Sequence, residues 1–254
     1  MNFVVAIPSY LRAKKLRSQT LDFLSSEKID PQAITIFVAD EDERREYEKV
    51  LLPDSYGRLV VGNLGLAEQR NFIHSYYPLG TKILFIDDDI KNLKWLTYRP
   101  LKNFVEEMFM IAEQEGVKLW SIQPASTLLY CKERVRVGKM FCVGCFYGQV
   151  NTADNQIPLL SACEDKWRSL YRYKTDGATM RYDGCCPNTF YFAKGGLSEY
   201  RKLRQHQDTV EVCKMFEEDC VLKKKKSGVS ECYWKQVSKK DLSLSNLSQA
   251  PRTD

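Results

Sequence analysis

Short apolar runs alternate with longer amphipathic stretches through the first half of this chain. Apolar runs rich in β-branched residues are typical of buried strands, and stretches whose apolar residues recur every three or four positions are typical of helices. The predicted strands lie at 3–7, 34–38, 59–61 and 83–86, and the predicted helices at 14–26, 66–76 and 101–114. Such regular alternation with short connections predicts an α/β fold with a doubly wound, mainly parallel sheet and helices on both faces.

The second half of the chain has a less regular pattern. Its predicted strands lie at 139–150, 178–182 and 189–192, and its predicted helices at 164–177 and 197–215. The last segment, 236–254, is polar and is expected to be disordered. We therefore expect a single domain over 1–235, which consists of a regular half, 1–115, and an irregular half, 116–235.

Three consecutive carboxylates follow the apolar run 83–86. In an extended backbone Asp87 and Asp89 point to the same side, and Asp88 points to the opposite side. A hard divalent cation such as Mg²⁺ is held in proteins by one or two carboxylates together with phosphate oxygens. The aspartate triplet therefore predicts a metal site, and a solvated acidic turn is the alternative.

Polar residues also follow the first two predicted strands. In a parallel sheet such positions meet at one edge, where ligands bind. The candidates are Ser9, Tyr10 and Arg12 after the first strand, and Asp40, Glu41 and Asp42 after the second. Neither a Gly-x-Gly-x-x-Gly motif nor a Walker-type loop follows the first strand, which argues against a Rossmann dehydrogenase and a P-loop NTPase.

Composition and cysteine usage indicate a soluble protein of a reducing compartment. The 254 residues are 44% hydrophobic, which is enough for a substantial core, and the net charge of +5 is only mildly basic. The first apolar run is too short for a signal peptide, and no stretch has transmembrane length. The nine cysteines form an odd, irregular set, so we expect a cytoplasmic protein without a disulfide framework. Cys142, Cys145, Cys185 and Cys186 lack two matched pairs, so we do not expect them to bind zinc.

Several motifs occur in an order that narrows the function. They are Ala6-Ile7-Pro8-Ser9-Tyr10-x-Arg12, Val38-Ala39-Asp40, Gly65-Leu66-Ala67-Glu68-Gln69-Arg70-Asn71, Phe85-Ile86-Asp87-Asp88-Asp89 and Glu164-Asp165. Over most of its length the chain thus resembles the GT-A fold glycosyltransferases, and the aspartate triplet looks like their Asp-x-Asp element. Glu164-Asp165 with Leu170 and Gly177, followed by Gly195-Gly196-Leu197-Ser198-Glu199-Tyr200-Arg201, is similar to the TET-associated glycosyltransferases. Members of that family occur in bacteriophages and are linked to sugar addition on 5-hydroxymethylcytosine in DNA.

The resemblance implies a metal-dependent nucleotide-sugar site in residues 1–115. It places Mn²⁺ or Mg²⁺ on Asp89, with Asp87 sharing the ion or bonding the ribose. A histidine from the C-terminal half often supplies a third ligand in this fold class, and His206 is the candidate here; the alternative for it is an exposed position on a polar helix.

The implied donor site draws on several elements. Its members are Pro8, Ser9, Tyr10, Arg12, Asp40, Glu41, Arg70, Asp87, Asp88, Gly195 and Gly196. Residues 8–10 would form the floor of the nucleotide site, and Asp40 with Glu41 would contact the nucleobase and ribose. Arg70 would lie near the diphosphate or hold an aspartate in place, since its bidentate geometry suits both. Strand alternation favours a structural role for Asp88. For Gly195 and Gly196, the alternative to a contact with the donor is a plain turn.

Glu164 and Asp165 are the implied catalytic carboxylates of the acceptor half, 116–235. An inverting glycosyltransferase needs one general base that deprotonates the acceptor hydroxyl. The resemblance assigns this role to Asp165, with Glu164 as a close second. The alternative is acidic capping of a helix N-terminus, and a retaining enzyme would use the pair differently.

These residues predict a glycosyltransferase, either a hexosyl- or a pentosyltransferase, that moves a sugar from a UDP-sugar to 5-hydroxymethylcytosine in DNA. A viral protein would act in the host cytoplasm. The basic residues Arg201, Lys202, Arg204 and 223–226 either follow the DNA backbone or form a solvated surface. Trp167, Tyr191 and Phe192 are candidates to receive a base that has left the stack. The alternatives are a GT-A enzyme acting on a glycan, lipid or protein hydroxyl, and a non-catalytic nucleic-acid-binding module.

Overall fold

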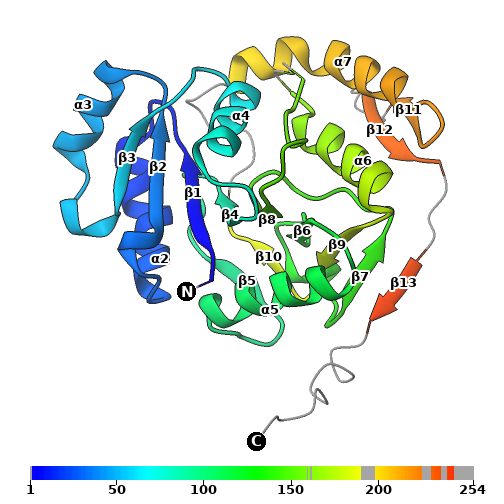
Figure 1. Ribbon diagram of the computed structural model, residues 1–254, viewed down its shortest axis with the longest axis horizontal. Coiled ribbons are helices and arrows are strands. Elements are labelled where there is room, and N and C mark those ends of the chain that lie inside the picture. Colours follow the sequence, from blue (N-terminus) through cyan, green and yellow to red (C-terminus); the bar gives the residue numbers. More distant parts are fainter. Residues whose placement is uncertain are drawn as a thin grey trace, which may run out of the picture.

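The computed structural model describes residues 2–158, 160, 162–189, 198–224, 230–235 and 239–242. Within these residues, a nine-stranded sheet in the order β13-β7-β9-β6-β8-β4-β1-β2-β3 forms the centre of the molecule (Figure 1). Its strands are β1 (Val4–Pro8), β2 (Ile34–Val38), β3 (Arg58–Val61), β4 (Lys82–Ile86), β6 (Leu119–Ile122), β7 (Val135–Gly138), β8 (Phe146–Val150), β9 (Thr179–Tyr182) and β13 (Lys239–Leu242). Two smaller sheets pair β5 (Leu93–Trp95) with β10 (Cys185–Pro187) and β11 (Cys220–Lys224) with β12 (Ser230–Trp234).

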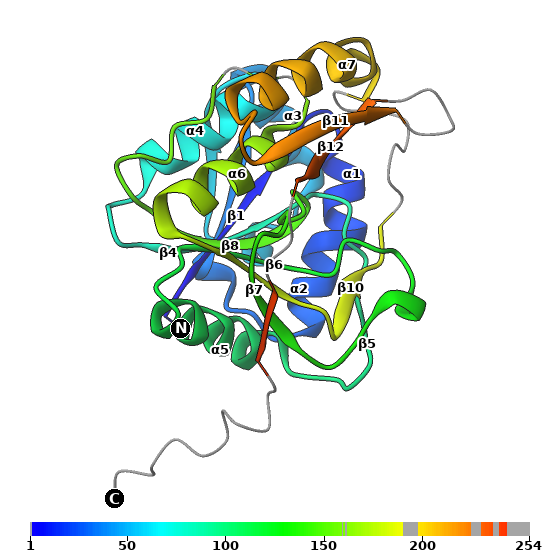
Figure 2. The ribbon, with the colours of Figure 1, turned by 90° about the vertical axis from the view of Figure 1, so that its right-hand side faces the viewer.

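Helices cover both faces of the large sheet (Figure 2). They are α1 (Ala13–Leu16), α2 (Asp22–Ser26), α3 (Glu41–Val50), α4 (Leu66–Tyr76), α5 (Leu101–Gln114), α6 (Glu164–Asp176) and α7 (Ser198–Met215). A π-helical turn, η1 (Arg17–Leu21), joins α1 to α2, and short 3-10 turns occur at η2 (Pro31–Ala33), η3 (Pro53–Ser55) and η4 (Leu128–Tyr130). The hairpin β11–β12 lies beside α7 at one end of the molecule (Figure 2).

The central strands are apolar on both sides because each side faces a different layer of helices. Val5 and Ile7 pack into a core that includes residues of α1, α2, α3 and α5, whereas Ala6 between them packs with Ile73 of α4. The same alternation continues in β2 and β4. This explains why the strands read as continuous apolar runs rather than as an alternating pattern.

The predicted α/β fold class is confirmed. Strands β3, β2, β1 and β4 are parallel to one another, and their observed limits agree with the predicted runs to within one residue. The second half contributes antiparallel pairs as well, because β8 runs against both β4 and β6 and β7 runs against β9. In β8, Gly148 leaves room for the fully buried Trp120 of β6, which lies directly opposite.

Several predictions for the second half require correction. Residues 139–145 are not part of a strand, because the strand material of 139–150 is confined to β8, and β6 was not predicted. Residues 239–242, expected within a disordered tail, pair as β13 with β7 at the sheet edge. In the strand predicted at 189–192, Thr189 is not extended in a sheet, and 190–192 lie outside the described residues.

Candidate active site

A cavity of about 350 Å³ opens at the carboxyl ends of β1 and β4. Ligands of α/β sheets bind at this edge, where loops carry polar side chains beyond the strands. Its lining includes Pro8, Ser9, Tyr10, Arg12, Gly65, Gln69, Arg70, Asp87, Asp88, Asp89, Gly144, Cys163, Glu164, Asp165, Lys166, Thr189, Gln205, Thr209, Ser230 and Glu231. Residues from both halves of the chain, more than 70 positions apart in sequence, therefore share one cavity.

The middle carboxylate of the triplet, Asp88, is held inside the protein. The Ser9 hydroxyl donates a hydrogen bond of 2.6 Å to Asp88, and the Arg12 guanidinium lies 3.2 Å from its other oxygen. Burial raises the pKa of the Asp88 carboxyl, and the Ser9 hydroxyl and the Arg12 charge oppose that rise. Asp88 thus anchors the first loop to the end of β4. Strand alternation does not extend to this carboxylate, because β4 ends at Ile86, Asp88 and Asp89 lie in a turn, and all three carboxylates line the cavity.

The outer carboxylates, Asp87 and Asp89, differ in their surroundings. Asp89 accepts a 2.9 Å hydrogen bond from the Thr189 hydroxyl, and its other oxygen lies 2.9 Å from Lys15 Nζ and 3.3 Å from Arg12. Asp87 is the most exposed of the three, and its carboxylate lies 3.7 Å from Arg70. Cationic side chains therefore surround this acidic edge and limit the repulsion between neighbouring carboxylates.

Arg70 and Glu164 form a buried ion pair that joins α4 to the first turn of α6. The Arg70 guanidinium also donates to the carbonyl oxygen of Gly144 at 2.8 Å and lies over the ring of Tyr147. Burial opposes the charge on Arg70, but Tyr147, Glu164 and Asp87 outweigh it and raise the pKa of the guanidinium. This arrangement gives Glu164 a fixed, charged partner and leaves its neighbour Asp165 to face the cavity.

Asp165 lies where the cavity meets a second hollow of about 370 Å³, because both linings include Val143, Asp165 and Lys166. The second hollow adds the basic residues Arg136, Lys139 and Arg181 and the aromatic residues Phe141 and Trp234. The two rings stack with centroids 4.9 Å apart, and Lys166 Nζ lies 3.8 Å from the centre of the Phe141 ring. A carboxylate at this junction can contact molecules bound on either side of it.

Some predicted site residues are not part of this lining. Asp40 caps α3 by accepting a 2.8 Å hydrogen bond from the Glu43 amide, and Glu41 is exposed beside Arg44. His206 is exposed on α7, and its Nδ1 lies 2.8 Å from the Ser230 hydroxyl. We therefore leave Asp40, Glu41 and His206 out of the proposed site.

Gly195, Gly196, Tyr191 and Phe192 lie outside the described residues. Trp167 is described, and it packs in a buried apolar cluster with Leu170 and Phe216 rather than lining either hollow. The structure also adds residues that sequence reasoning missed. Lys15 and Thr189 contact Asp89, and Lys166 lies between the two hollows. Lys15 could have been found as a basic residue in the first turn of the helix that follows the first strand, whereas nothing local marks Thr189.

The carboxylates at the cavity edge fit a hard divalent cation. Asp87 and Asp89 line the same cavity, and oxygen donors of this kind suit Mn²⁺ and Mg²⁺. The neighbouring Lys15 and Arg12 add positive charge, which suits a ligand that brings phosphate oxygens to the ion.

His74 lies one turn beyond Arg70 on α4 and is buried. Its Nδ1 is 3.0 Å from Asn151 Oδ1 and 3.3 Å from Asn155 Nδ2. Burial lowers the pKa of His74 to about 3, and the nearby charges of Arg168 and Arg172 act in the same direction. The helix that carries Arg70 is thus held by a histidine that stays neutral in the folded protein.

We expect His74 alone to remove roughly 2 kcal/mol of unfolding free energy between pH 7 and pH 5. The unfolded chain binds a proton near the ordinary pKa of 6.5, whereas the folded protein does not until about pH 3, so stability falls as the pH drops through this window. Urea unfolding at several pH values measures the slope. His74→Gln should flatten it, and His206→Gln, at the exposed second histidine, should not. Equal slopes in the two variants would contradict the assignment.

No protein-family model matches the chain, and no curated protein matches its sequence. Solved structures do share its fold. A mycobacterial protein superposes with a TM-score of 0.56 and 11% identity, covering 98% of this chain and 88% of that chain. Mannosyl-3-phosphoglycerate synthase from Rubrobacter xylanophilus gives 0.53 and 13%, covering 98% and 89%. Glucosyl-3-phosphoglycerate synthase from Mycobacterium tuberculosis, in complex with Mn²⁺, UDP and glucosyl-3-phosphoglycerate, gives 0.54 and 13%, covering 98% and 92%.

These similarities extend over nearly the whole chain and establish that it shares the α/β fold of these synthases. Because the identities are low, they concern the fold, and the chemistry has to be argued from the cavity itself. Among the helices that the structure describes, none combines the length and apolarity needed to cross a membrane.

Proposed function

We propose that this chain is a metal-dependent glycosyltransferase that moves a sugar from a nucleotide-diphosphate donor, a UDP-sugar, to an acceptor hydroxyl. The observation that carries the proposal is the position of Asp165 between a cavity containing Asp87, Asp89 and Arg70 and a second hollow. Group transfer needs a donor site and an acceptor site that meet at a base, and two hollows that share the carboxylate Asp165 support this assignment. The solved synthase with Mn²⁺ and UDP supports the choice of donor and cation.

On the donor side, Asp87 and Asp89 would hold Mn²⁺ or Mg²⁺, which neutralises charge that develops on the leaving diphosphate. Lys15 and Arg12 lie against Asp89 and can bond phosphate oxygens at the same edge. The Arg70 guanidinium stays charged, and its Nη2 lies 3.7 Å from Asp87 Oδ1, where it restrains that carboxylate. The chain thus supplies a preorganised positive edge at which a diphosphate can leave.

On the acceptor side, Asp165 would accept the proton of the attacking hydroxyl, giving inversion at the sugar carbon. Its Oδ1 already accepts a 2.8 Å hydrogen bond from the Lys166 amide, which fixes the carboxylate at the start of α6. Glu164 is paired with Arg70 inside the protein and serves to position that residue. Of the two implied catalytic carboxylates, this pairing supports Asp165 as the base and Glu164 as a positioning residue.

We propose 5-hydroxymethylcytosine in DNA as the acceptor. The motif resemblance to the TET-associated glycosyltransferases supports this choice, and so does the chemistry of the second hollow. Trp234 and Phe141 offer aromatic surface on which an extruded base can stack, and Lys139 and Lys166 offer positive charge to nearby phosphates. A small phosphorylated acid is the second candidate, because the same basic side chains suit one phosphate and the structural neighbours are phosphoglycerate synthases.

The decisive experiment combines the protein with Mn²⁺, a panel of sugar nucleotides and one of three acceptors. The acceptors are 5-hydroxymethylcytosine DNA, the same DNA with unmodified cytosine, and 3-phosphoglycerate, with products followed by mass spectrometry. We expect a mass gain only on hydroxymethylated DNA. Transfer only to 3-phosphoglycerate would select the second candidate. Failure with every acceptor, together with no metal-dependent UDP release, would refute the enzymatic proposal and favour a binding module.

Asp89→Asn tests the metal within the same assay. We expect at least about a 100-fold loss of transfer, equivalent to about 2.7 kcal/mol, because the amide is a poorer ligand and carries no charge. Direct Mn²⁺ titration by calorimetry should show weaker binding in parallel. The matched control is Asp42→Asn, at an exposed aspartate in the first turn of α3 that lies outside the cavity. Wild-type Mn²⁺ affinity in Asp89→Asn would refute the metal assignment.

A further inference from the structure

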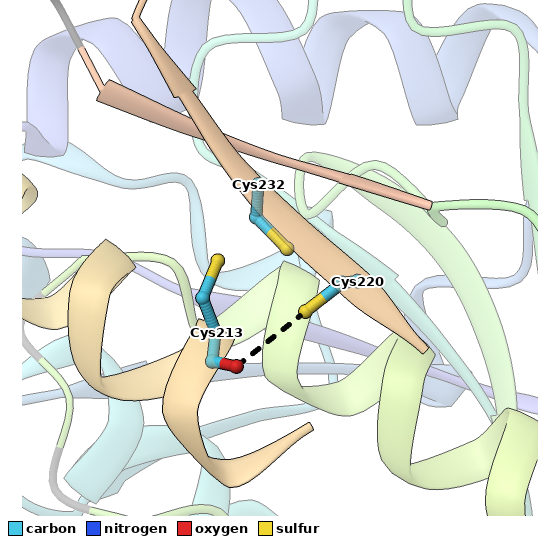
Figure 3. A group of neighbouring side chains, drawn as sticks. All are labelled: Cys213, Cys220 and Cys232. Atoms are coloured by element: carbon cyan, nitrogen blue, oxygen red, sulfur yellow. Dashed lines mark hydrogen bonds between the residues drawn. The ribbon is translucent and has the colours of Figure 1, made fainter. Parts of the chain in front are cut away.

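Three cysteine thiols from one short stretch of the chain, residues 213–232, converge at the wall of the donor cavity. Cys213 lies in the last turn of α7, Cys220 begins β11 and Cys232 lies in β12. Their sulfur atoms all lie within 4.8 Å of one another, and the three side chains point toward a common centre (Figure 3). None of these residues belongs to the cysteine pairs that the sequence made candidates for zinc.

The surroundings of the three thiols are apolar. All three are buried and pack in a cluster with Trp167, Leu170 and other hydrophobic residues. The Cys220 thiol lies 3.3 Å from the carbonyl oxygen of Phe216 and 4.0 Å from that of Cys213. A single buried cysteine is an ordinary apolar filler, but three sulfurs directed at one point form a ready set of soft ligands.

The spacing agrees with a metal centre. In a tetrahedral site with zinc–sulfur bonds of about 2.3 Å, the sulfurs lie about 3.8 Å apart. Three sulfurs already within 4.8 Å reach that geometry by closing less than about 1 Å, which rotation about the side-chain bonds can supply. A disulfide, by contrast, would use two of the three thiols and leave the third without a role in the cluster.

We propose that Cys213, Cys220 and Cys232 bind a thiophilic divalent cation, Zn²⁺, as three thiolates. Binding forms three metal–sulfur bonds and releases the three thiol protons to solvent. All nine cysteines and both histidines are among the described residues, and no further cysteine, histidine or carboxylate there joins the cluster. The fourth position is therefore assigned to a water molecule.

Such an ion would stabilise one wall of the donor cavity. Gln205 and Thr209 of α7 and Ser230 and Glu231 of β12 line that cavity. The three thiolates would fasten α7 to both strands of the hairpin at its buried side. Cys232 itself also lines the cavity, but the ligands here are thiolates rather than the carboxylates Asp87 and Asp89, so the site does not depend on the proposed glycosyl transfer.

Cobalt substitution in the full-length protein tests the proposal. The protein is purified without chelator, its zinc is measured by mass spectrometry and removed, and Co²⁺ is then titrated in the presence of excess Mg²⁺. We expect equimolar zinc and, with cobalt, the near-ultraviolet charge-transfer band of a thiolate ligand, which carboxylate sites do not give. Absence of both zinc and this band would overturn the proposal.

Matched cysteine variants locate the site. Cys232→Ala should lose the band and bound zinc, whereas Cys142→Ala, at a fully buried cysteine outside the cluster, should keep both. If the band and the bound zinc are lost in both variants, or are kept in both, the ion binds elsewhere and the proposed site is wrong. If Cys232→Ala does not fold, maleimide labelling of the wild type with peptide mapping replaces it. Zinc should then protect Cys213, Cys220 and Cys232 at least tenfold, and equal labelling with and without zinc would refute the site.

Discussion

Replacing Asp165 by asparagine is expected to slow sugar transfer roughly 100- to 10,000-fold while the protein stays folded and binds UDP with unchanged affinity. Asparagine has the same shape and can accept the 2.8 Å hydrogen bond from the Lys166 amide, so the start of α6 is preserved. It cannot take a proton from the acceptor hydroxyl. Single-turnover transfer to hydroxymethylated DNA measures the chemical step, and calorimetry with UDP and Mn²⁺ measures the donor site.

Two comparisons separate this prediction from a general loss of structure. Asp42→Asn removes an exposed carboxylate of α3 and should transfer at the wild-type rate. The second comparison is between the two readouts of Asp165→Asn itself: sugar transfer should fall, whereas the affinity for UDP should stay at the wild-type value. A variant that transfers at the wild-type rate would show that Asp165 is not the base and would return that role to Glu164.

The local pattern of the first half was sufficient to predict much of the fold. Three elements have the predicted limits: helices 66–76 and 101–114 and strand 34–38. In each of them, the spacing of the apolar residues and the residues that flank the element indicate the same start and end. The second half depends on pairings between distant segments. β6 is a four-residue strand whose neighbours are β8 and β9, and nothing in its own sequence distinguishes it from a buried turn.

The candidate site likewise contains residues that the local sequence predicts and residues that only contacts between distant segments bring together. Residues attached to strand ends, such as Ser9, Arg12 and Asp89, could be predicted because topology brings those ends to one edge. The resemblance assigns the base to Asp165 ahead of Glu164, but the ion pair that distinguishes the two carboxylates could not be predicted, because it depends on Arg70 reaching Glu164 from α4. The cluster of Cys213, Cys220 and Cys232 was equally hidden, since it forms only when α7 packs on the β11–β12 hairpin.

Replacing Arg70 by methionine should lower the free energy of unfolding by about 3–5 kcal/mol, because it leaves Glu164 buried without its charged partner. For a chain of this size the loss corresponds to a melting temperature roughly 6–20 °C lower. Urea denaturation and calorimetry measure the two quantities. The control is Arg44→Met, which removes the cation of solvent-screened pairs with Glu48 and Glu41 and should leave the free energy of unfolding nearly unchanged.

The double variant Arg70→Met/Glu164→Gln identifies the cause of that loss. Removing both charges together removes the uncompensated buried carboxylate, so most of the lost stability should return, and the double-mutant cycle should give a coupling energy of at least about 1 kcal/mol. A loss in Arg70→Met no larger than in Arg44→Met, or a double variant as unstable as the single one, would contradict this account.

The double variant should transfer sugar poorly even when it is folded. It lacks the Arg70 guanidinium, which lies 3.7 Å from Asp87 and restrains that carboxylate at the proposed diphosphate site. Recovered stability without recovered transfer would show that the buried pair serves both the fold and the donor site.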